Sequence, residues 1–86
     1  MNLLTRKDID GYVRRALREN DFDVYGVRIG TNENSVRIQA DVKPRKVIEE
    51  DVVKYRDSVS EILAQEIQEL LPICIELNTL ELNLVQ

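Results

Sequence analysis

The longest hydrophobic pattern in the chain runs from Val47 to Leu71 and has the spacing of an amphipathic helix. No glycine or proline interrupts the run, so we predict one continuous helix, about 37 Å long, over residues 47–71. Ser58-Val59-Ser60-Glu61 also fits a capping box, which leaves a break at Asp57 as the alternative. The apolar residues that recur at intervals of three and four are Ile48, Val52, Tyr55, Val59, Ile62, Leu63, Ile67 and Leu70.

This predicted helix carries more apolar surface than contact with one sheet requires. The side through Val52, Val59, Leu63 and Leu70 is expected to face the core. A strand of eight residues spans only about 26 Å, so the helix is expected to overhang its sheet and to need cover from a second chain. The residues predicted for that interface are Val47, Val52, Val53, Tyr55, Ser60, Ala64, Ile67 and Leu71 on the helix, and Leu80, Leu82 and Leu84 in the last strand.

Three shorter patterns precede the long helix. Thr5 with Asp8 forms a short capping box, and helical spacing follows, which predicts a helix over about 5–20. Alternating apolar residues predict strands over about 22–30 and 35–43, and the short link between them predicts an antiparallel hairpin.

A last β segment is predicted over about 73–85, after Pro72 ends the long helix. Its apolar parity changes between Leu77 and Leu80, which either a bulge near Asn78-Thr79 or a two-residue hairpin explains. Asn-Thr is a poor sequence for a two-residue hairpin turn, because the favoured turn types place glycine second. We therefore favour one long bent strand, or one strand with a short extension that pairs elsewhere.

The element order predicts a single α+β domain over 1–86, a two-layer α-β-β-α-β sandwich. We expect a mainly antiparallel sheet of order 2-1-3, with both helices on one face and the third strand parallel to the second. This layout resembles that of KH-type domains, BON-type domains and the cytoplasmic domain of cation-efflux transporters. A KH domain requires a Gly-x-x-Gly loop and the transporter domain binds metal through histidine; the chain has neither, so we assign it to no family.

Composition fits a small globular protein rather than a disordered one. The chain has 86 residues, 43% of them hydrophobic, and a formal net charge of −4. The single cysteine indicates a reducing compartment, so we expect a cytoplasmic protein, with neither a signal peptide nor a membrane span. Residues 1–46 hold ten basic and seven acidic residues, whereas residues 47–86 hold two basic and nine acidic residues.

The residues needed for common catalytic and metal sites are missing. There is no histidine, one cysteine, and no glycine-rich phosphate loop, so we predict no catalytic residue, no metal ligand, no cofactor and no enzymatic activity. Cys74 is expected to be a small buried or half-buried apolar residue. Glu66 falls among apolar positions; we favour a position at the solvent-exposed rim over a buried acid with a raised pKa.

These observations favour a non-enzymatic protein-interaction module that self-associates, as a homodimer or larger, through the long helix, the last strand, or both. Binding to nucleic acid or a nucleoprotein is the first alternative. An inhibitor that presents an acidic helix face is the second, with Glu50, Asp57, Glu61, Gln65 and Glu69 on that face. The basic surface in the first alternative comprises Lys7, Arg14, Arg18, Arg28, Arg37 and Lys43.

Overall fold

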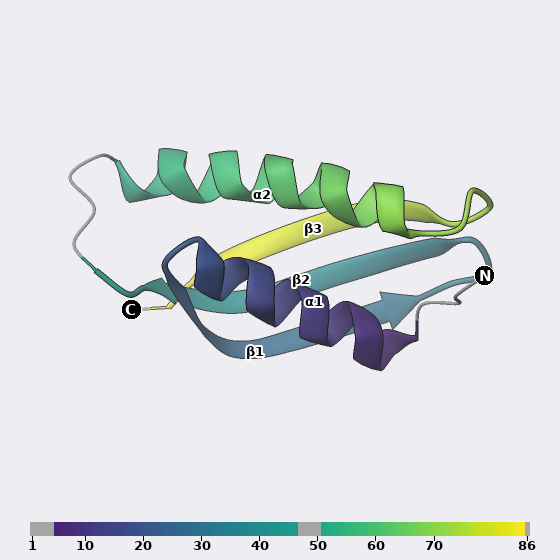
Figure 1. Ribbon diagram of the computed structural model, residues 1–86, viewed down its shortest axis with the longest axis horizontal. Helices are drawn as coiled ribbons and strands as arrows, with labels where there is room; N and C mark the ends of the chain where they lie inside the picture. The colour runs from purple at the N-terminus through teal and green to yellow at the C-terminus, as the bar shows by residue number, and fades with distance from the viewer. Residues whose placement is uncertain (1–4, 47–50, 86) are drawn as a thin grey trace.

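The computed structural model describes residues 5–46 and 51–85 and shows a small α+β fold (Figure 1). Two helices pack with a three-stranded mixed sheet. In chain order the elements are α1 Arg6–Glu19, β1 Phe22–Thr31, β2 Ser35–Pro44, α2 Val52–Leu70 and β3 Glu76–Leu84.

The strand order is β1-β2-β3, so the predicted order 2-1-3 is wrong. β2 is central, antiparallel to β1 and parallel to β3, so the sheet is mixed rather than mainly antiparallel. The crossover through α2 returns the chain directly beside the strand it left. Because β2 is central, its core-facing side chains are fully covered, whereas Val24, Val27 and Ile29 on the edge strand β1 are half-buried.

The first helix begins as its sequence predicts. Thr5 caps α1, its side chain accepts a hydrogen bond from the Asp8 N–H at 3.1 Å, and the Asp8 carboxylate accepts one from the Thr5 N–H at 3.0 Å. This reciprocal capping box satisfies two backbone N–H groups that a helix start otherwise leaves unpaired. The Thr5 hydrogen bonds also hold the pKa of Asp8 below its ordinary value.

The second helix is continuous through Asp57, so the alternative of a break there is wrong. It starts later than predicted, at Val52, because Asp51 adopts a non-helical conformation and caps it by accepting a hydrogen bond from the Val53 N–H at 2.9 Å. Residues 47–50 lie outside the described residues. The 19 residues of α2 span about 28 Å. The ten residues of β2 span about 33 Å, so the expected overhang of helix beyond sheet is wrong.

Both helices cover the same face of the sheet and share one hydrophobic core (Figure 1). The last strand carries the predicted bulge: Val36 pairs with Leu77 and Arg37 with Thr79, so Asn78 is the extra residue. This insertion keeps Leu77 and Leu80 on the core side, which explains the change of parity. The buried core residues are Ile9, Val13, Ala16, Leu17, Phe22, Val36, Ile38, Ala40, Val42, Val59, Leu63, Ile67, Leu71 and Leu82.

Candidate interaction surfaces

Side chains of α2 cover the outer edge of β3. The Gln68 side chain accepts a hydrogen bond from the Leu77 N–H at 2.8 Å and donates one to the Ile75 carbonyl at 3.1 Å. The Ser60 hydroxyl donates a hydrogen bond to the Leu80 carbonyl at 3.4 Å, and the Arg56 guanidinium donates one to the Leu82 carbonyl at 3.5 Å. An exposed strand edge normally offers such groups to another chain. Here α2 side chains bond to one N–H and two carbonyls of β3, so this edge offers fewer free groups for strand pairing than a bare edge.

The edge formed by β1 has no such cover. Within residues 5–46 and 51–85, no side chain bonds to a backbone group of β1. A bulge at Tyr25 interrupts the strand near its start, and six further register pairs follow from Gly26 to Thr31. The two edges of the sheet therefore differ: one is covered by side chains and the other is open.

One side of α2 and the turn after it expose large apolar side chains. Ile62 is 60% exposed, Leu70 48% and Ile73 105%, and we refer to these three residues as the α2 apolar surface. Ile62 and Leu70 are eight residues apart, two steps of four, so they lie along the same side of the helix with Glu66 between them. Ile73 follows Leu70 by three residues, at most about 11 Å between Cα atoms.

The structure places most of the predicted interface residues in or against the chain's own core. Ile67 and Leu71 are buried because α2 is rotated so that they face the sheet, and Leu82 of β3 is buried as well. Leu70, predicted to face the core, is exposed instead, and Val53 is 43% exposed. Val47 lies outside the described residues. Those that are half-buried are Val52, Tyr55, Ser60, Ala64, Leu80 and Leu84.

Glu66 is the residue that could have revealed the exposed side of α2 from sequence. It is exposed, as predicted, and stands between Ile62 and Leu70. Its carboxylate lies close to α1: burial first, and then the Glu66 charge, raise the pKa of the Tyr12 hydroxyl. A charged residue at this position indicates that the apolar residues four before and four after it border solvent rather than the core.

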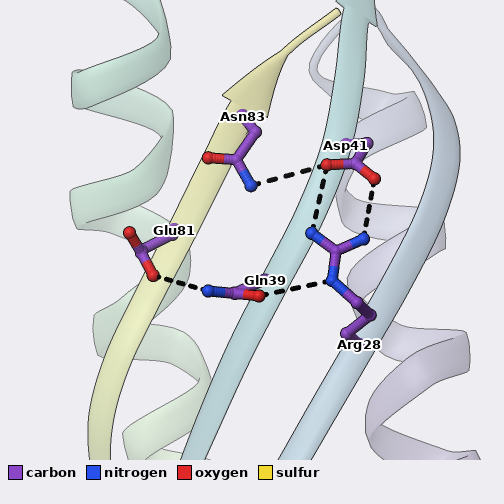
Figure 2. A network of polar contacts seen from close by, with 5 residues as sticks. All are labelled: Arg28, Gln39, Asp41, Glu81 and Asn83. Carbon is purple, nitrogen blue, oxygen red and sulfur yellow. Dashed lines mark hydrogen bonds and ion pairs between the residues drawn. The ribbon is translucent and has the colours of Figure 1, made fainter.

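The face of the sheet opposite the helices is polar. Figure 2 shows a network across all three strands, in which Arg28 binds both carboxylate oxygens of Asp41, at 2.8 and 3.2 Å. Gln39 accepts from Arg28 at 3.3 Å and donates to Glu81 at 2.9 Å, and Asn83 donates to Asp41 at 3.4 Å. The hydrogen bond from Arg28 lowers the pKa of Asp41, and Asp41 in turn raises the pKa of Arg28.

The predicted basic surface is divided between two sides of the molecule. Lys7, Arg14 and Arg18 lie on α1, whereas Arg28, Arg37 and Lys43 alternate with the core-facing residues of their strands and so lie on the open face. Two of these cations are already paired: Arg14 contacts Asp10 at 2.6 Å and Arg28 contacts Asp41. A shallow hollow of about 550 Å³ does adjoin Arg37, but Glu81 also lines it.

Candidate chemistry is sparse in the part of the chain that the structure describes. No group of three or more Cys, Asp or Glu residues could hold a metal ion there, and no helix there is long and apolar enough to cross a membrane. Cys74 is exposed, so its expected burial is wrong; it lies in the turn between α2 and β3, outside the strand pattern used to place it. Three of the residues predicted for an acidic inhibitory face are exposed on α2: Asp57, Glu61 and Glu69.

No protein-family model, curated protein or solved structure matches this chain.

Proposed function

We propose that the protein is a non-enzymatic interaction module that forms a homodimer through the α2 apolar surface, Ile62, Leu70 and Ile73. The observation that carries the proposal is the exposure of these three side chains, 60%, 48% and 105%, on one side of α2 and in the turn that follows it. Burying a large aliphatic side chain contributes on the order of 1.5–3 kcal/mol to the free energy of association. In a symmetric dimer both copies bury the same residue, so this contribution is made twice.

Charge supports a second copy of this chain as the partner. α1 carries five basic and three acidic residues, whereas α2 carries two basic and four acidic residues. Both helices lie on the same face of the sheet (Figure 1). In a two-fold pair the acidic α2 of one copy can lie beside the C-terminal half of the other copy's α1, which exposes Arg15 and Arg18, and Glu66 and Glu69 lie beside the apolar residues of α2. Complementary charge of this kind favours the correct orientation of two surfaces.

Sedimentation equilibrium of the wild-type protein and two matched variants tests the proposal. Ile62→Glu and Gln65→Glu each add one negative charge to an exposed position of α2, but only Ile62 belongs to the α2 apolar surface. The wild-type 10.0 kDa chain should sediment as a dimer at micromolar concentration. Ile62→Glu should weaken dimerisation by about tenfold or more, roughly 1.4 kcal/mol, while Gln65→Glu changes it little.

Two outcomes contradict the proposal. One is a wild-type protein that stays monomeric up to submillimolar concentration. The other is an equal effect of Ile62→Glu and Gln65→Glu, which would assign the change to charge alone. Because Ile62 is exposed, its replacement should leave the monomer folded, and far-ultraviolet circular dichroism checks this.

A further inference from the structure

We propose that the open edge of β1 binds an extended acidic segment of another protein by strand addition. This site is separate from the α2 apolar surface and does not depend on dimerisation. An added strand obtains its affinity from main-chain hydrogen bonds, and its selectivity from the side chains that flank the edge. Both requirements can be examined along β1.

The first requirement is a backbone edge that no other group occupies. β1 extends over ten residues, Phe22–Thr31, and has β2 on one side only. As described above, no side chain within residues 5–46 and 51–85 bonds to its backbone, whereas the β3 edge is covered by Gln68, Ser60 and Arg56. The sheet can therefore be extended at β1 much more readily than at β3.

The second requirement is a place for the side chains of the added strand. A groove of about 380 Å³ lies between the N-terminal half of α1 and the β1 edge, lined by Arg6, Lys7, Asp10, Val27 and Ile29. Val27 and Ile29 are half-buried there, so an apolar side chain from an added strand would complete their cover. On an extended segment, the residues that enter the groove alternate with residues that face the opposite side of the sheet.

The charge of the groove selects an acidic segment. Asp10 is neutralised by Arg14, at 2.6 Å. Arg6 donates one hydrogen bond to the Thr31 hydroxyl, at 2.9 Å, which holds its guanidinium over the end of β1 with further N–H groups to donate. Lys7 is exposed and makes no ion pair with any residue in the described ranges. The charge left for a ligand is positive.

Arg6 and Lys7 lie at the end of α1 where a positive charge is unfavourable to the helix itself. Arg6 and Lys7 occupy the first turn of α1, the positive end of the helix dipole, where acidic residues are favourable and basic ones are not. They do not stabilise the helix there. A carboxylate bound in the groove would interact favourably with both side chains and with the helix end.

A second copy of this chain fits the β1 edge poorly. Antiparallel pairing of two β1 strands would place the two α1 helices side by side on one face of a continuous sheet. The two α1 helices, each with five basic and three acidic residues, would then lie beside each other, and like charges in contact oppose association. An acidic partner of different sequence satisfies the same edge without this repulsion.

The test uses two synthetic peptides, one of alternating valine and glutamate and one of alternating valine and lysine. Titration into ¹⁵N-labelled protein, followed by amide chemical shifts and hydrogen exchange, should show that only the glutamate peptide binds and that it protects amides of β1. Lys7→Glu should weaken this binding about fivefold to tenfold, because it reverses an exposed charge beside the peptide. Lys54→Glu, an equal change at an exposed site on α2, should alter it less than about twofold.

Several results would overturn the inference. These are equal binding of the two peptides, protection at β3 in place of β1, equal effects of Lys7→Glu and Lys54→Glu, or no binding at millimolar peptide. Protection of β1 amides that rises with protein concentration alone, and that Lys7→Glu strengthens, would show that the edge is occupied by a second copy. N-methylation of the glutamate peptide on alternate residues should abolish binding, since it removes the main-chain donors that strand addition requires.

Discussion

The Tyr55 hydroxyl donates a hydrogen bond to the Asn20 carbonyl at 2.9 Å and so joins the first turns of α2 to the end of α1. Its ring also packs against Phe22, with the centroids 5.6 Å apart. The Asn20 carbonyl belongs to the last turn of a helix, where carbonyl groups lack intrahelical partners. Tyr55 therefore holds two elements together, a role that helical spacing alone did not distinguish from membership of an interface.

Replacing Tyr55 with phenylalanine should lower the free energy of unfolding by about 1 kcal/mol, because the hydroxyl is lost while the ring remains. Urea denaturation measures the effect. Tyr25→Phe is the control, since Tyr25 is 63% exposed and its hydroxyl bonds to no described residue. The assignment fails if the two substitutions have the same effect.

Gln68→Ala should uncover the outer edge of β3. Loss of the two side-chain hydrogen bonds to the Leu77 N–H and the Ile75 carbonyl should lower the free energy of unfolding by about 1–2 kcal/mol. The Leu77 amide should also exchange its hydrogen faster with solvent. Gln65→Ala, at an exposed site of the same helix, should leave Leu77 exchange unchanged; faster exchange in both variants would mean that α2 as a whole had loosened.

Gly11→Ala should stabilise the protein. Gly11 lies within α1, and a Cβ added there would meet no atom within 4 Å apart from the neighbouring backbone of its own helix. Alanine has a helix propensity about 1 kcal/mol better than glycine, so the thermal midpoint should rise. Gly11→Pro, which cannot donate the helical hydrogen bond, should lower the midpoint instead, and a fall with alanine would indicate a contact at this position.

Acid should destabilise the protein partly through Asp41. Its pKa in the folded protein is below the ordinary value of 3.8, because Arg28 and Asn83 donate hydrogen bonds to the ionised form. The stabilisation is therefore complete above pH 3.8 and is lost as the pH falls through the lower folded-state pKa. Asp41→Asn should reduce the slope of unfolding free energy against pH in that range.

The helices and strands were largely predictable because their signals are local. The capping box at Thr5 and Asp8, the alternation of β2 and the parity change around Asn78 each depend on residues close together in the chain. The strand order was not predictable in this way, because it depends on which strand has a neighbouring strand on each side. In the folded sheet Val36, Ile38 and Ala40 of β2 are buried and β1 is half-buried. This difference exists only once the sheet has formed.

The candidate surfaces were predictable only in part, for a related reason. A helical wheel places Ile62, Ile67, Leu70 and Leu71 within one broad apolar arc but does not give the rotation of the helix on its sheet. Packing turned Ile67 and Leu71 inward and left Ile62 and Leu70 in solvent. The cover of the β3 edge was likewise hidden, because Gln68 and Leu77 are nine residues apart and meet only through the crossover.

The covered edge of β3 also limits how far copies of this protein can join into larger assemblies. Fibrous polymers of stacked strands grow because each unit offers a fresh template at both ends. Here Gln68, Ser60 and Arg56 already occupy one end, so whatever docks on β1 finds no second template behind it. Growth along the sheet beyond one addition is therefore disfavoured.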